Sequence, residues 1–504
     1  MKFLIALVTA CMPAILVAQT KVFHIPFEFE KKLLAASDYD AYFLENPAAS
    51  AISLVLKDNR KTQYLQLGKK FEVLSKIDLE LNSTVFKEDI TDYRGGTANG
   101  NVFYFIYEEK EKKAFSKPVT RFQLETVDFA ARAVTHSVLF EIPKAEKVLS
   151  SFSDNNAYYT ITADDKAKEL VFYVVNDAGA VKEQRIPFTV PEGAGKERDH
   201  VSEYFKNLRV FKTNEEPDLS NAVSQAKLFS FPDKLSFVIN NEGHDIHLFT
   251  VQLPDLTVKE NFIDVDGLKK ESKDKIYVNS FLRKDKLFSL VLNRKNIQLA
   301  VHDIPAGNLL GKQEINEDSD PGLFALPPVT EKRMGKKAST KDVDNVKKLI
   351  RALDRGTEGL MVTENKKQQF VVTIGTYDLI PIGGSSGGGW VGGWTTSTAP
   401  AGSAMPTVTT WNPNMYYRPG LPSYAQTNAR YYTTTYFRLL IDSSGKKYAR
   451  GDVPFPVAEQ VKDYMQDVDP KTKAINQFAI GTKQYFGHYN KETRTYDIEE
   501  IRVR

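Results

Sequence analysis

The residues best suited to contact another molecule are aromatic, and they gather in one segment. The chain has 504 residues and three tryptophans, and all three fall between positions 382 and 428. Aromatic rings are enriched where proteins contact other proteins, and they dominate the energy of such contacts. The sequence therefore predicts a binding surface that contains the following residues: Trp390, Trp394, Trp411, Tyr416, Tyr417 and Tyr424.

The same segment opens with a glycine-rich stretch, 383–394. Ordering so many glycines costs backbone entropy, and a connection of this length is usually either functional or disordered. Residues Gly383 to Gly387 match the G-x-S-x-G spacing of a serine nucleophile, with Ser385 at its centre. That motif requires a helix directly after the serine. Here glycine and tryptophan follow, which favours a chance match, and we expect no catalytic residue.

Metal-binding patterns are incomplete. His244 and His247 are three positions apart, so in a strand they would point to opposite faces. His302 beside Asp303 has the pattern of an ordinary strand end. The acidic stretch 316–322 resembles a calcium loop, but a proline replaces its glycine and Pro327 stands where a bidentate glutamate is required. We expect no metal and no cofactor.

Charge is balanced along the chain. Lys and Arg number 67 against 64 Asp and Glu, a formal net charge of +3, which gives no electrostatic argument for nucleic-acid binding. A local basic run, 332–337, continues in Lys347 and Lys348. It could meet anionic lipid or polysaccharide, but a solvated linker is the favoured interpretation.

Residues 1–19 have the layout of a secretory signal peptide. Lys2 precedes an apolar run, and small Ala18 precedes Gln19, which predicts cleavage after one of these two residues. Cys11 follows Val-Thr-Ala and offers an alternative, acylation as a lipoprotein. No later apolar run is long enough for a membrane-spanning helix. We therefore expect export to the periplasm, the outer-membrane region or the extracellular space. If cleavage occurs, the exported chain has no cysteine for disulfides or thiol chemistry.

The elements that must position the aromatic segment are revealed by an internal repeat between Lys227 and Asn316. Strand-like segments 228–231, 234–241, 245–254 and 257–264 are followed by a second set, 277–282, 286–293, 296–305 and 309–316. Pro254 and Pro305 take equivalent positions in the two sets. Four short alternating strands per copy are predicted.

The same pattern recurs along the chain, with second strands starting near the following positions: Ile52, Val102, Tyr158, Leu235 and Leu287. This spacing is close to the 40–50 residues of a four-stranded propeller blade. The repeats resemble those of the kelch and WD families, although they lack a regular glycine doublet and a recurring Trp-Asp, so the resemblance implies fold alone. We predict an all-β chain folded as a β-propeller of about seven blades, with six or eight as alternatives. Its last strands would pair with its first.

Residues 20–504 are predicted to form one propeller domain with insertions at about 191–221, 339–356 and 382–428. The second insertion should contain a helix over 340–355, with Val343, Val346, Ile350 and Leu353 on one face. Ser339 and Asp342 would form its capping box and Gly356 its stop. Residues 456–467 should form another helix, with Val457, Val461, Tyr464 and Met465 on one side.

The leading functional hypothesis is an exported, non-catalytic platform that binds an envelope or outer-membrane protein through the segment 383–425. A glycan-binding module is the first alternative. A hydrolase or lyase with acidic residues gathered at the propeller channel is the second.

Overall fold

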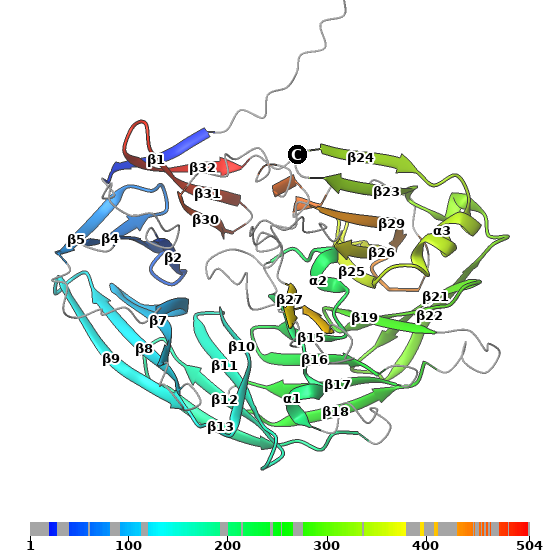
Figure 1. Ribbon diagram of the computed structural model, residues 1–504, viewed down its shortest axis with the longest axis horizontal. Coiled ribbons are helices and arrows are strands. Elements are labelled where there is room, and N and C mark those ends of the chain that lie inside the picture. The colour runs from blue at the N-terminus through cyan, green and yellow to red at the C-terminus, as the bar shows by residue number, and fades with distance from the viewer. Residues whose placement is uncertain are drawn as a thin grey trace, which may run out of the picture.

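A computed structural model describes the fold for the following residues: 20–27, 40–58, 61–80, 91–111, 119–191, 200–212, 215–241, 245–253, 255–265, 276–334, 337–379, 394–397, 408–411, 431–446, 448, 453–454, 456–457, 460–461, 464, 473–481 and 483–501. Within these ranges the chain is dominated by antiparallel strands. Seven sheets of four or five strands follow one another around a ring (Figure 1). The chain is a seven-bladed β-propeller, and the prediction of about seven blades is confirmed.

The first three blades have four strands each, and chain order is also sheet order. Blade 1 contains β2 (Asp40–Asn46), β3 (Ala51–Lys57), β4 (Lys61–Gly68) and β5 (Val73–Glu80). Blade 2 contains β6 (Thr91–Asn99), β7 (Val102–Glu111), β8 (Val119–Asp128) and β9 (Ala133–Ile142). Blade 3 contains β10 (Glu146–Asp154), β11 (Ala157–Asp164), β12 (Glu169–Val175) and β13 (Val181–Pro187).

The doubled stretch of the sequence forms two neighbouring blades, as predicted. Blade 4 contains β15 (Ala226–Ser230), β16 (Lys234–Asn240), β17 (Ile246–Gln252) and β18 (Val258–Ile263). An additional strand, β14 (Arg209–Lys212), pairs parallel to β15 at its edge. Blade 5 contains β19 (Tyr277–Arg283), β20 (Lys286–Leu292), β21 (Asn296–Asp303) and β22 (Asn308–Asn316).

Blades 6 and 7 take strands from separate parts of the chain. Blade 6 has the sheet order β24 (Lys337–Asp342), β23 (Leu326–Met334), β29 (Tyr431–Ile441), β26 (Phe370–Leu379) and β25 (Glu358–Glu364). Blade 7 contains β30 (Lys473–Ile480), β31 (Lys483–Asn490) and β32 (Thr495–Ile501), with β1 (Thr20–Pro26) beside β32. The first strand thus completes the last blade, which confirms the predicted ring closure. A separate ribbon joins β27 (Trp394–Ser397) to β28 (Val408–Trp411).

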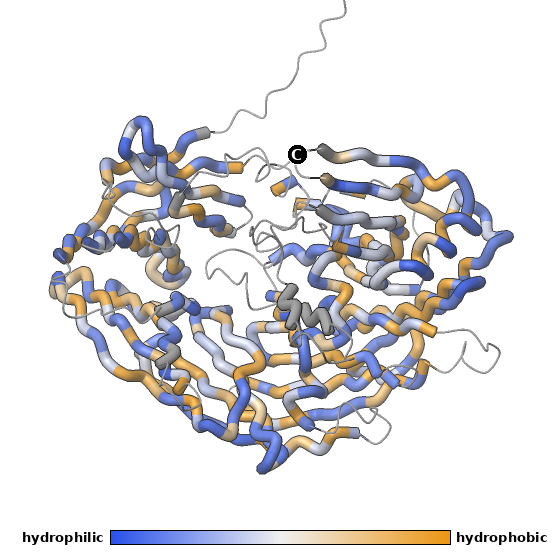
Figure 2. Tube along the Cα trace, in the orientation of Figure 1, coloured by the Kyte–Doolittle hydropathy of each residue, from blue (hydrophilic) through white to orange (hydrophobic). Residues whose placement is uncertain are grey.

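The inner strands of the blades are rich in apolar residues and are buried along nearly their whole length, as in β3, β11, β16 and β20. The outer strands are mostly exposed, as in β5, β9 and β18, and Figure 2 shows apolar and polar residues interspersed along the strands. Successive side chains of a strand point to opposite faces, and stacked blades bury both faces of the inner strands. Most blade boundaries therefore contain apolar clusters. One runs through blades 3 and 4, and a larger one runs through blades 4, 5 and 6.

Asparagine side chains also connect neighbouring blades. Each one donates from its amide to a backbone carbonyl of a neighbouring blade, so that this carbonyl keeps a hydrogen bond on folding. The bonds are 2.8–2.9 Å long and join Asn476 to Ala41, Asn46 to Gly100, and Asn156 to Ala98. They fix the relative position of blades 7, 1, 2 and 3.

The helices of the insertions differ in part from the prediction. Helix α3 covers Val346–Leu353, with Asn345 as its N-cap, whereas a helix from residue 340 with a capping box at Ser339 and Asp342 was expected. The capping-box prediction is wrong because residues 337–342 pair with β23 as a fifth strand. The predicted apolar face is confirmed for Val346, Ile350 and Leu353, which are buried, but Val343 lies before the helix.

Further short helical segments occur among the described residues. The first insertion forms α1 (Val201–Tyr204) and α2 (Leu219–Ala222), which the sequence reading did not anticipate. A 3-10 helix, η3, covers Pro321–Leu323. In the segment 456–467, the described residues Val457, Val461 and Tyr464 are helical and pack against blade 7, while Met465 lies outside the described ranges. No helix in the described ranges is long and apolar enough to cross a membrane.

Candidate functional site

Two of the six predicted contact residues have a described backbone. Trp394 begins β27 and Trp411 ends β28, and the two are direct partners in the antiparallel ribbon. Cross-strand partners occupy the same face of a ribbon. The ribbon therefore presents both tryptophan positions on one face, with the Thr395–Thr410 pair on the other. The remaining four lie outside the described residues: Trp390, Tyr416, Tyr417 and Tyr424.

The aromatic insertion leaves blade 6 and returns to it at neighbouring positions. Strand β26 ends at Leu379, and β29 starts at Tyr431. These two strands are paired continuously from Phe370–Ile441 to Leu379–Tyr432. Paired Cα atoms in such a ladder are about 4.5–5.5 Å apart. Segment 380–430 is thus attached by both ends to one end of an ordered sheet.

A polar and aromatic cluster supports this attachment point. The Tyr432 hydroxyl donates to Glu331 Oε1 over 2.8 Å, and its ring stacks on Tyr377 with centroids 5.0 Å apart. Burial, followed by the Glu331 charge, raises the pKa of Tyr432, and burial also raises the pKa of Tyr377. Both phenols remain protonated at neutral pH. They stabilise the ends of the insertion and are not suited to act as bases.

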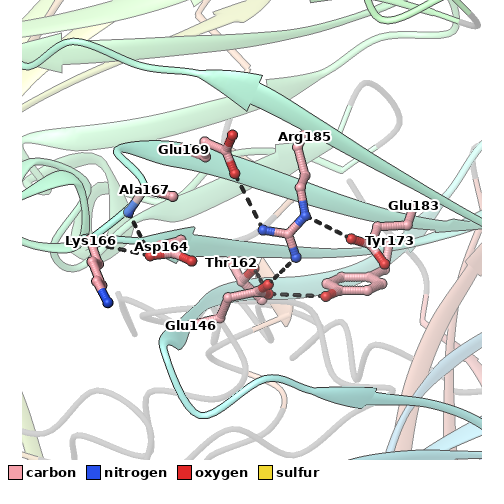
Figure 3. Close-up of polar contacts among 9 residues, drawn as sticks. All are labelled: Glu146, Thr162, Asp164, Lys166, Ala167, Glu169, Tyr173, Glu183 and Arg185. Atoms are coloured by element: carbon pink, nitrogen blue, oxygen red, sulfur yellow. Dashed lines mark hydrogen bonds and ion pairs between the residues drawn. The ribbon is translucent and has the colours of Figure 1, made fainter.

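A cluster of polar side chains in blade 3 is drawn in Figure 3. The side chain of Glu146 is fully buried and accepts hydrogen bonds from Thr162 Oγ1 at 2.6 Å, the Tyr173 hydroxyl at 3.0 Å and Arg185 Nη2 at 2.6 Å. These four residues come from β10, β11, β12 and β13, one from each strand. Arg185 also contacts Glu169 and Glu183.

This cluster is built for stability rather than for proton transfer. Its buried carboxylate has three donors, and its guanidinium contacts three carboxylates. Burial alone would lower the pKa of Arg185, but the hydrogen bonds from its guanidinium to these carboxylates raise that pKa. Burial, followed by Glu146, raises the pKa of Tyr173. Groups that hold their protons this firmly do not exchange them near neutral pH.

A second buried carboxylate, Glu125 in blade 2, is enclosed in the same way. It accepts from the Tyr107 hydroxyl at 3.0 Å, and His136 Nε2 lies 3.0 Å from its other oxygen. Burial, followed by the Glu125 charge, raises the pKa of Tyr107 well above its usual value. A side-chain hydrogen bond also joins Glu125 to Tyr64 of blade 1, so the carboxylate is committed to structural partners in two blades.

One serine lies close to an acid and a lysine. Ser202 Oγ donates to Asp165 Oδ2 over 2.7 Å, and Lys147 Nζ contacts both residues at 2.8–3.0 Å. Burial raises the pKa of Asp165, but hydrogen bonds from Lys147 and Ser202 outweigh it and leave that pKa below its usual value. A carboxylate stabilised in this way is a poor base for activating a serine. Asp165 also accepts from the Ser202 backbone N–H in α1, so this carboxylate is committed to structural contacts.

The histidines and the acidic turn do not assemble a metal site in the described ranges. His247 Nδ1 bonds the Tyr204 hydroxyl, and His302 Nε2 lies 3.3 Å from Ser289 Oγ. Burial lowers the pKa of both histidines, that of His247 to about 4. In the calcium-like turn, Asn316 and Asp320 accept backbone N–H groups of their own turn. No group of three or more metal-ligating side chains occurs among the described residues, and His244 and Ser385 lie outside them.

The described residues of the basic run belong to the paired strands β23 and β24, so the prediction of a solvated linker is wrong for them. Arg333 is buried and lies 3.6 Å from Glu331, whereas Lys332 is exposed. Lys347 and Lys348 of α3 pair with Glu317 and Asp344. The run therefore contributes partly to the blade and only partly to the surface.

One buried group was missed by the sequence reading. Lys227, in the first strand of the doubled stretch, has no exposed area. Its burial depends on β14 and on segments from blades 5 and 6, which no local pattern in the sequence predicts. An alternation of buried and exposed positions in β15 could not have indicated it either, because all five residues of that strand are buried.

Comparison with known proteins shows only distant likeness. No protein-family model matches the chain, and no curated protein matches it. Among solved structures, the Dos1 propeller is 8% identical with a TM-score of 0.33, and each chain is covered to 96%. A prolyl endopeptidase is 11% identical with a TM-score of 0.28, over 90% of this chain and 55% of that one.

A cobalt-substituted Synechocystis ACO is 9% identical with a TM-score of 0.27, over 56% of this chain. The chain spans 63% of the length of this ACO, and little more than half of the endopeptidase. Likenesses this weak assign neither a family nor an activity, so the functional argument depends on the chain's own residues.

Proposed function

We propose that this protein is an exported β-propeller that binds a protein of the cell envelope, with the blade 6 insertion as its contact element. The observation that carries the proposal is the ribbon within this insertion. In this ribbon, two of the three tryptophans of the chain occupy directly paired positions. The insertion that contains the ribbon starts after β26 and ends before β29, and these two strands are paired in blade 6.

The anchoring gives the contact element a defined origin. A long connection that starts and ends on adjacent paired strands can be lengthened or altered without disturbing the blade, because the ladder between β26 and β29 is complete without it. The seven blades then serve as a rigid support. A rigid support lowers the entropy cost of ordering a contact surface when it binds.

The described titratable clusters support a binding role over a catalytic one. Glu146, Glu125 and Asp165 each accept hydrogen bonds from side chains of their own surroundings. A catalytic acid or base must instead reach a substrate. Each of these carboxylates has a structural explanation.

A paired substitution tests the proposal. Trp394→Ala with Trp411→Ala replaces one cross-strand pair of the ribbon. The matched control, Thr395→Ala with Thr410→Ala, changes the next cross-strand pair on the opposite face. Proteins that co-purify with the tagged full-length chain from its native envelope are compared. Hot-spot aromatics cost about 2 kcal/mol or more when truncated, so the tryptophan variant should lose its partner at least thirty-fold while the threonine variant keeps it.

The fold of each variant is checked by its thermal unfolding and far-ultraviolet circular dichroism. Deletion of 383–425 provides a second test that does not depend on the ribbon. If the deletion variant co-purifies with the same proteins and unfolds as the parent protein does, the proposal is contradicted. Loss of binding to a purified polysaccharide, with protein partners unchanged, would instead support the glycan-binding alternative.

A further inference from the structure

Lys227 lies where three blades meet. It belongs to β15 of blade 4, and its amine donates to the Ser224 carbonyl and, over 2.9 Å, to Asn279 Oδ1 of blade 5. The Asn279 amide in turn donates to the Glu358 carbonyl of blade 6 over 3.0 Å. One amine and one amide therefore connect blades 4, 5 and 6.

The carbonyl of Ser224 belongs to a segment that crosses to blade 6. This segment, residues 218–224, is called the strap, and it contains α2. In Figure 1, α2 lies beside β25. Two strap side chains, Leu219 and Val223, approach blade 6 where it has glycine. A Cβ at Gly359 would lie 2.9 Å from each of them. Because the strap needs this close approach, its seating on blade 6 is specific.

Among the described residues, no acidic side chain pairs with the Lys227 amine. Both acceptors of the amine are neutral. Its cross-strand partner on β14 is Arg209, another cation, and the charge of Asp218 acts on that arginine. Glu358 takes part through its backbone oxygen. A neutral amine has two N–H groups, which match the two acceptors, whereas an ammonium has a third to satisfy.

We propose that the strap is a pH-dependent latch: it closes on blade 6 when the Lys227 amine is neutral, and proton uptake favours an open state in which the ammonium meets water. The latch acts on β26, the strand that leads into the aromatic insertion, because Gly375 of β26 also lies against Leu219. The inference does not depend on the proposed partner.

The direction and size of the effect follow from proton linkage. Burial lowers the pKa of Lys227 to about 7 in the closed state, against 10.5 for a solvated lysine. The open state therefore binds more protons between these two values, and opening becomes more favourable as the pH falls through this window. The opening equilibrium should rise about fifty-fold from pH 9 to pH 7, and only about twofold from pH 7 to pH 6.

Hydrogen exchange measures this opening directly. The backbone amides of Asn221, Ala222, Val223 and Ser224 all donate within the strap and report its opening. After correction for the pH dependence of intrinsic exchange, their protection should fall about fifty-fold between pH 9 and pH 7. Amides in the ladders of β16 and β20 should not show this change. An equal change in those ladders would mean global unfolding and would overturn the latch.

Variants assign the effect to the lysine. Lys227→Met should abolish the pH dependence of strap protection, whereas the control Lys234→Met should retain it. Lys234 lies in the same blade, but its partner is the exposed Asp285. If Lys227→Met does not fold, Asn279→Asp is the deciding variant. A carboxylate beside the amine stabilises the ammonium, so the change in strap protection between pH 9 and pH 7 should be less than tenfold. A full dependence in whichever variant folds, or unchanged protection in the parent, contradicts the proposal.

Discussion

Replacing Glu146 by alanine should destabilise the protein strongly, since the Glu146 cluster connects all four strands of blade 3. The substitution removes a fully buried carboxylate together with its bonds from Thr162, Tyr173 and Arg185. Two buried hydroxyls lose their acceptor, and each buried group left unsatisfied costs about 1–3 kcal/mol. Arg185 keeps Glu169 and Glu183 and its side chain is 37% exposed, so it does not become an unpaired buried charge. We expect the free energy of unfolding to fall by about 2–6 kcal/mol.

Urea unfolding, followed by fluorescence and by far-ultraviolet circular dichroism, measures this loss. Glu183→Ala is the matched control, because Glu183 contacts the same arginine but its side chain is 46% exposed. Exposed ion pairs contribute about 0–1 kcal/mol, so the control should change little. Equal small effects of both substitutions would refute the reasoning. They would mean that the cluster does not stabilise blade 3, and a catalytic role for Glu146 would then need to be considered.

Three further predictions concern the ring, the strap and a buried histidine. Deletion of residues 20–26 removes the strand that completes blade 7, together with the Lys21–Asp497 ion pair, and should lower the unfolding temperature. An unchanged unfolding temperature would contradict ring closure by β1. Gly359→Ala places a Cβ against Leu219 and Val223 and should cost about 1–3 kcal/mol in urea unfolding, whereas a neutral result would argue against close seating of the strap. Burial lowers the pKa of His247 to about 4 from 6.5. The free energy of unfolding should therefore fall by up to about 3 kcal/mol as the pH falls from 6.5 to 4. His247→Phe should flatten this part of the pH–stability profile, and an unchanged profile would count against a buried, neutral imidazole.

The blades could be predicted from the sequence because their information is local and repeated. In blades 4 and 5 the observed strands start within two residues of the predicted segments, since alternation and tight turns lie within each copy. Ring closure was also predictable, because an unpaired edge strand at each end of the chain is disfavoured.

The insertions were less predictable because distant pairing determines their structure. Residues 337–342 resemble the start of a helix, yet they form a strand because β23 offers them an edge. Helices α1 and α2 have four residues each, too few to display a helical period. Lys227 has the appearance of a surface residue until the strap and blades 5 and 6 enclose it. The aromatic insertion was identified by composition alone, and only the ribbon pairing was added by the structure.

Site-specific photo-crosslinking in the native envelope tests the central claim most directly. A photoreactive residue is placed at Thr396, on the same ribbon face as Trp394, and in a second protein at Thr340, on the exposed β24 strand of the same blade. We predict a discrete crosslinked protein partner from position 396 and none from position 340. A partner captured from position 340 but not from position 396 would contradict the assignment of the ribbon as the contact element.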